Sequence, residues 1–228
     1  MNKASFSLAA IITLTGCATT TNNQINLIPM YGGIQKSAAL IEADNAFLKE
    51  IDAKGVSRDS SSRYFSSKGW YFYYQGNDAV AMKRFNQAWL LDTNNASAYF
   101  GFGSILGRRR SSIDSVIMLM KLAHHHNPSD LPIASSLAYS FSTKAYQLKL
   151  KNDTAWNSYK DTSLNIYASI ASNLKFESDY GLQYLESLIM LAQKEMALRC
   201  ISQIDTANLK ERLKTRYSFL VSEANKLP

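Results

Sequence analysis

The sequence contains few of the residues that interrupt helices or crosslink a chain. Its 228 residues include four prolines, ten glycines and two cysteines. So few helix breakers favour long helices over many short strands and turns. Two cysteines exclude a disulfide-rich scaffold. Cys200 lies in an apolar helical pattern, which is typical of a small buried core residue.

Motifs that carry catalysis are missing as well. The chain has no GxSxG, HExxH, CxxC or P-loop sequence. Its three histidines are the consecutive residues 124–126, and neighbours on a helix point about 100° apart, so they cannot converge on one metal. Their position before Pro128 instead suits cations at a helix C-terminus. We therefore expect no catalytic residue, no metal and no cofactor, and a role in binding rather than an enzyme.

What is present is a globular balance of residues. Apolar residues make up 46% of the chain and charged residues 19%, which predicts a folded core. The formal net charge is +7. Such an excess suits either solubility or an anionic partner.

The N-terminus has the layout of an export signal. Lys3 precedes a short apolar stretch, Phe6 to Leu14. This stretch is shorter than the roughly 20 residues that a spanning helix needs, so it predicts a cleaved signal rather than a permanent anchor.

The signal ends in Leu14-Thr15-Gly16-Cys17, which resembles the lipobox of bacterial lipoproteins. The resemblance implies cleavage before Cys17 and attachment of lipid to that cysteine. Ala18, where inner-membrane lipoproteins tend to carry Asp, implies an outer-membrane anchor facing the periplasm. An exported protein is not expected to meet nucleic acid. We therefore assign 1–16 to the signal peptide and 17–35 to a lipid-anchored tether.

Apolar residues at helical spacing fill the rest of the chain. A first amphipathic helix is expected at 36–54, with Leu40, Phe47 and Ile51 on one face, followed by a polar break at 57–62. Further helices are expected at 130–150, 153–174, 178–192, 194–204 and 207–226.

The segment between them has a repeating pattern. In 62–95, small and bulky residues recur along two helices that flank a Gly-Asn-Asp turn: Phe65, Gly69, Phe72, Gly76, Ala81, Phe85 and Ala88. This order resembles the tetratricopeptide repeat (TPR), a helix–turn–helix unit of 34 residues. Thr93 stands where that family usually has a closing proline.

A second, weaker copy occupies 96–128. It is in register with the first through Tyr99, Gly103, Leu106, Ser115, Leu119 and Leu122, although Arg110 replaces the turn glycine. The resemblance covers 62–128, and the rest of the chain is interpreted from periodicity alone. Together they predict an all-α fold over 36–228, namely a short right-handed α–α superhelix with an N-terminal helix and a C-terminal capping helix.

Family members bind peptides on the concave face of the first helix of each repeat. Here that face carries a second set of aromatic and basic residues: Arg63, Trp70, Tyr73, Tyr74, Phe100 and Arg108. Tyrosine, tryptophan and arginine often dominate binding energy. The alternative is that Trp70 and Tyr73 pack against the 36–54 helix or a neighbouring repeat.

The turn of the second repeat is Arg108-Arg109-Arg110. It is either an anionic contact, for lipid phosphate, an acidic peptide or peptidoglycan carboxylates, or a solvated turn near a helix end. The sequence as a whole predicts an interaction scaffold for an unknown protein of the cell envelope. The alternatives are a periplasmic immunity or inhibitor protein and a binder of cell wall or lipid.

Overall fold

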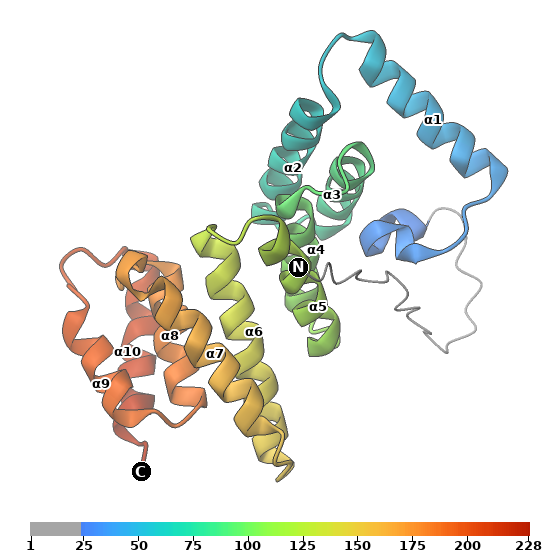
Figure 1. Cartoon of the computed structure of the whole chain (residues 1–228). Helices are drawn as coiled ribbons and strands as arrows, with labels where there is room; N and C mark the ends of the chain where they lie inside the picture. The colour runs from blue at the N-terminus through green and yellow to red at the C-terminus, as the bar shows by residue number, and fades with distance from the viewer. Residues whose placement is uncertain (1–23) are drawn as a thin grey trace, which may run out of the picture. The chain divides into compact units, whose positions relative to one another are not determined.

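The computed structural model describes residues 24–228, and in these residues all regular structure is helical (Figure 1). Two short 3-10 segments, Ile25–Leu27 and Pro29–Gly33, precede the first α-helix. The α-helices are α1 (Ala38–Ala53), α2 (Arg58–Tyr74), α3 (Asp78–Leu91), α4 (Ala96–Arg108), α5 (Ile113–His126), α6 (Leu131–Leu150), α7 (Trp156–Ile170), α8 (Asp179–Met190), α9 (Lys194–Gln203) and α10 (Glu211–Asn225). The all-α prediction is confirmed.

The chain divides into two compact units at the Thr93–Asn94 bond. In the first unit, α2 and α3 pack as a hairpin, and α1 contacts α2, where Phe47 meets Phe65 edge to face. In the second unit α4 pairs with α5, α6 with α7 and α8 with α9, while α10 packs on α8 and α9.

The helical hairpins share one kind of turn. A residue with positive φ follows the first helix of each pair: Gly76 (75°), Arg110 (53°), Asn152 (56°) and Ala192 (55°). At each turn the amide of the following residue donates to a carbonyl near the helix end, for example Asn77 N–H to Phe72 O at 2.9 Å and Ser111 N–H to Leu106 O at 3.0 Å. This bonding is the Schellman motif, which satisfies the carbonyls left over at a helix C-terminus.

Close packing of α2 on α3 depends on Gly69. A Cβ placed on Gly69 would lie 2.6 Å from Cε1 of Phe85, a ring that is fully buried. Thirty-four residues later, a Cβ on Gly103 of α4 would lie 2.8 Å from the terminal Cε of Met120 in α5. The two sequence copies therefore use the same device, a glycine where the second helix crosses the first.

Helix α2 begins earlier than the sequence indicates. The polar segment 57–62 was expected to be a break, but α2 starts at Arg58 and Ser57 is its N-cap, accepting from Ser60 N–H at 3.2 Å. Ser62 lies inside the helix, where its buried hydroxyl donates to Ala88 O of α3 at 2.8 Å. The serines favour a cap, and tertiary packing decides which serine serves as one.

The segment 25–33, which the sequence places in the tether, packs on α3. Ile25 and Tyr31 are buried, and the side-chain amide of Asn86 donates to the carbonyls of Asn26 and Ile28 at 3.1 and 2.9 Å. Lys36 Nζ lies 3.3 Å from the centre of the Tyr31 ring. We call residues 25–33 the N-terminal clasp.

Substituting the crossing glycines tests the packing. Gly69→Ala is expected to lower the free energy of unfolding by about 1–3 kcal/mol, because the Phe85 ring cannot yield. Gly103→Ala should cost less, because the end of Met120 is flexible. Gly107→Ala, at a helical glycine with no atom within 4 Å of the added Cβ, is the control and should stabilise slightly. Urea unfolding measures all three, and equal losses at Gly69 and Gly107 would contradict the packing.

At the turns, introducing a glycine is expected to stabilise the fold. Ala192→Gly is expected to raise the free energy of unfolding by about 1 kcal/mol, because glycine adopts positive φ without steric cost. Ala168→Gly, on the exposed side of α7 with ordinary helical φ, should lower it by about 0.5–1 kcal/mol. If thermal unfolding moves in the same direction for both variants, the left-handed turn is not the cause.

Candidate interaction surface

Helix α2 carries an exposed row of aromatic side chains. Tyr64, Tyr71 and Tyr74 are 57%, 58% and 74% exposed. Tyr64 and Tyr71 are seven residues apart and Tyr71 and Tyr74 are three apart, so these tyrosines share a helix face. Trp70 is four residues before Tyr74 and borders that face. We call Tyr64, Trp70, Tyr71 and Tyr74 the α2 aromatic surface.

Trp70 connects this surface to the core. Its ring meets the buried Phe85 edge to face at 5.3 Å between centroids, and it stacks on the exposed Tyr74 at 5.9 Å with 30° between the planes. The ring of Tyr73 also meets the indole of Trp70 edge to face, with 5.4 Å between the ring centroids. Trp70 and Tyr73 are both half-buried. Trp70 thus packs against α3 while it also supports the exposed Tyr74.

Arg63 lies two turns before Trp70 on the same helix. Its guanidinium pairs with Asp59 and donates to Ser60 Oγ at 3.2 Å, and both charged side chains are more than half exposed. Exposed pairs of this kind contribute little to stability, so exchanging Asp59 for another carboxylate costs little. Arg63 is a basic group at the end of the aromatic row.

The remaining groove residues lie in the second unit. Phe100 of α4 is half-buried and packs against the core of Val116, Met120 and Phe141. Arg108 is the last residue of α4 and is exposed. On α2, by contrast, Arg63, Trp70, Tyr73 and Tyr74 lie on one side of a single helix. Sequence reasoning missed Tyr64 and Tyr71, although their spacing of seven residues was a usable signal.

The three arginines form the α4/α5 turn as expected. Arg109 is the C-cap of α4, and Arg110 takes the left-handed conformation that Gly76 takes in the α2/α3 turn. All three side chains are exposed. The turn therefore presents positive charge at the end of a hairpin.

The histidines occupy the last turn of α5, as the sequence indicates. The ring of His126 stacks on Tyr99 of α4 at 5.4 Å with 9° between the planes, while His125 is exposed. Across residues 24–228, no group of three or more histidine, cysteine, aspartate or glutamate side chains is placed to hold a metal ion.

Cys200 and Glu186 carry reactive side chains, but their contacts give both of them a structural role. Burial raises the pKa of the Cys200 thiol to about 12, so at neutral pH it is a protonated core group, as predicted. Glu186 of α8 accepts from Tyr139 OH of α6 at 3.0 Å and from Arg216 of α10 at 2.5 Å. Burial raises the pKa of Tyr139, which therefore stays a hydrogen-bond donor. This brace ties three helices together.

The predicted cleavage motif Leu14, Thr15 and Gly16 and the lipidation site Cys17 lie outside the described residues. Within residues 24–228, no helix is both long and apolar enough to cross a membrane. We find no protein family, characterised protein or solved structure that matches this chain. The fold and the surface define an all-helical protein built of helical hairpins, with an exposed aromatic face on α2.

The two aromatic neighbours on α2 should respond differently to truncation. Trp70→Ala is expected to lower the free energy of unfolding by about 2–4 kcal/mol, because it removes the contact with Phe85. Tyr74→Ala should cost less than about 1 kcal/mol, because most of that side chain is in water. Chemical denaturation of the purified variants measures both. A stable Trp70→Ala variant would contradict the anchoring contact.

Proposed function

We propose that this chain is an outer-membrane-anchored lipoprotein of the TPR type that acts as a protein–protein interaction scaffold in the cell envelope. The observation that carries this proposal is the α2 aromatic surface, where three tyrosines are more than half exposed on a helix whose opposite side is fully packed. A contiguous patch of exposed apolar side chains often marks a site of protein–protein interaction.

The repeated hairpins support the TPR-type superhelix. Gly69 and Gly103 are 34 residues apart, and so are the turn residues Gly76 and Arg110. The boundary between the compact units, at Thr93–Asn94, lies two residues before the end of the first sequence copy. Helix α10 would be the capping helix, since it packs on α8 and α9 with charged residues such as Arg212 and Lys214 exposed.

The anchor would keep the domain close to the bilayer. Seven residues, 18–24, separate the proposed lipidated Cys17 from the N-terminal clasp, and in any conformation they span at most about 25 Å. A scaffold on so short a connection would recruit its partner to the membrane surface rather than far into the periplasm. Several acyl chains are needed for stable anchoring, because each buried methylene contributes only about 0.8 kcal/mol.

The surface chemistry suits a peptide segment of a protein partner. Tyrosine and tryptophan provide contact area with few rotatable bonds, so little side-chain entropy is lost on binding. Trp70 is already held by Phe85 and Tyr73, which leaves the exposed tyrosines as the adaptable part. Arg63 would pair with a carboxylate of the partner after leaving Asp59.

Crosslinking in living cells tests this function. A photoreactive amino acid at position 71 or 74 is expected to capture one dominant envelope protein. The Tyr71→Ala/Tyr74→Ala variant should weaken capture by at least about tenfold, since hot-spot aromatics each contribute more than about 1 kcal/mol.

Two controls make the result specific. Phe219→Ala removes an aromatic side chain that is 61% exposed in the second unit, and it should leave capture unchanged. Cys17→Ala should mislocalise the protein and lose the partner while the domain stays folded. Crosslinks that go only to lipid or peptidoglycan would instead favour the cell-wall or lipid alternative, and rescue from one secreted toxin would favour the immunity alternative.

A further inference from the structure

The turn between α6 and α7 exposes an aliphatic side chain at its end. Leu150, the last residue of α6, is 67% exposed, and Tyr146 one turn earlier is 41% exposed. The chain reverses through Lys151 and Asn152, whose φ is +56°, and α7 begins at Trp156. We call Tyr146, Lys149, Leu150, Lys151 and Trp156 the α6/α7 tip.

Basic groups surround this apolar end. Lys149 Nζ and Lys160 Nζ lie 5.2 and 5.0 Å from the centre of the Trp156 ring. The acidic groups nearby are already engaged, since Asp153 accepts the amide of Ala155 at 2.9 Å and Asp161 lies 3.6 Å from Lys160. The tip therefore presents a leucine, two amphipathic rings and an excess of ammonium groups.

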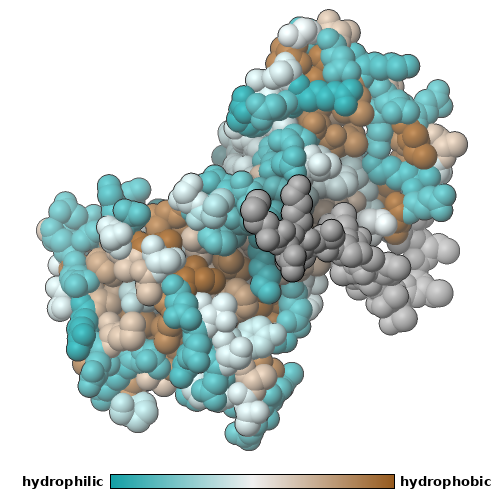
Figure 2. All heavy atoms as spheres, in the orientation of Figure 1, coloured by the Kyte–Doolittle hydropathy of each residue, from teal (hydrophilic) through white to brown (hydrophobic). Residues whose placement is uncertain are grey.

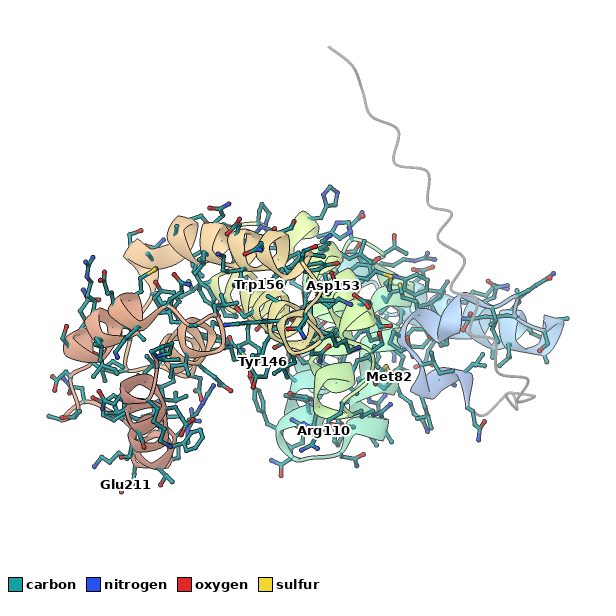
Figure 3. The ribbon with its side chains drawn as sticks, turned by 90° about the horizontal axis from the view of Figure 1, so that it is seen from below. Met82, Arg110, Tyr146, Asp153, Trp156 and Glu211 are labelled. Carbon is teal, nitrogen blue, oxygen red and sulfur yellow. The ribbon has the colours of Figure 1, made fainter. Side chains whose placement is uncertain are left out.

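A second cationic turn projects on the same side of the unit. Helices α4 and α6 run in the same direction, and the α4/α5 and α6/α7 turns both lie at the lower end of the second unit (Figure 1). Figure 3 looks at that end, where Arg110, Tyr146, Asp153 and Trp156 are labelled. Residues 107–115 and 146–161 together carry six Lys or Arg and three Asp, a net charge of +3.

The position of Leu150 sets it apart from the other exposed apolar side chains. Figure 2 shows hydrophobic residues on the visible face of both units. At the α6/α7 tip, the exposed leucine stands on a projecting turn instead. A projecting turn cannot enclose a peptide, but it can enter a fluid surface that yields around it.

We propose that the α6/α7 tip is a membrane-binding element that places Leu150 among the headgroups of an anionic phospholipid bilayer. Tryptophan and tyrosine prefer the membrane–water interface, and lysines beside them keep their ammonium groups at the phosphates while their stems lie in apolar surroundings. The arginine turn adds attraction at longer range. This contact is separate from acylation of Cys17 and does not depend on it.

A fluorescent probe at the tip reports insertion directly. The full chain with Cys17→Ser cannot be acylated, and a Thr154→Cys thiol can be labelled selectively because Cys200 is buried. With vesicles of phosphatidylglycerol and phosphatidylcholine, the probe at 154 should brighten and be quenched by bromine-labelled acyl chains. The same probe at Ala207→Cys, in the exposed α9–α10 connection, should stay in water.

Charge and apolar contributions are then separated by substitution. Lys149→Gln/Lys151→Gln is expected to weaken vesicle binding by the tip about 30-fold, or about fivefold per lysine. Leu150→Ser should weaken it about tenfold. Lys210→Gln/Lys214→Gln makes the same change in net charge at the start of α10 and should alter binding less than twofold.

Circular dichroism of each variant establishes that it is folded. Equal binding by the tip and α10 double variants would overturn the proposal, because only net charge would then matter. A probe at 154 that is never quenched would overturn insertion. Binding of an acidic protein at the tip without any binding of vesicles would assign the surface to a protein partner and overturn the proposal as well.

Discussion

One residue in the left-handed conformation closes each helical hairpin from α2 to α9. Gly76, Arg110, Asn152 and Ala192 all have φ between 53° and 75°, and the amides that follow them bond back to the preceding helix. This turn reverses the chain so sharply that the second helix must lie along the first. The packing of the helices and the aromatic surface on α2 both depend on that reversal. Only the α2/α3 hairpin uses glycine, the residue that adopts positive φ without steric cost.

Once the helices are antiparallel, small residues at the crossing decide how closely they approach. Gly69 lets the Phe85 ring lie against the α2 backbone, and the same ring supports Trp70. In the α6/α7 hairpin the small residues are serines, where Ser163 donates to Ala138 O at 2.9 Å and lies 2.6 Å from Ser142. The aromatic surface on α2 is thus a consequence of core packing, because the ring that fills the space beside Gly69 also fixes the indole above it.

Much of the helical layout could be predicted from residue spacing. The expected helices at 130–150 and 194–204 match α6 and α9 to within a residue, and the burial of Cys200 is also as expected. The predicted start of α2 was wrong, because four serines in this segment are equally good N-caps by residue type: Ser57, Ser60, Ser61 and Ser62. The exposed Tyr64 and Tyr71 were overlooked because α2 has aromatic residues nearly all round, and periodicity alone cannot say which of them face water.

The sequence by itself determined most of the helices and the positions of the turns between them, because these depend on side chains within about two helical turns of each other. Tertiary structure alone decided the contacts between residues far apart in the chain. It brought Asn86 to the carbonyls of the N-terminal clasp 58 and 60 residues away, and it joined Arg216 to Glu186 and Tyr139. Such partners are selected by which helix faces meet, and no local pattern encodes that choice. The same reason explains why Trp70 could be recognised as an aromatic residue of α2, whereas its anchoring on Phe85 and its support of the exposed Tyr74 emerged only from the packed hairpin.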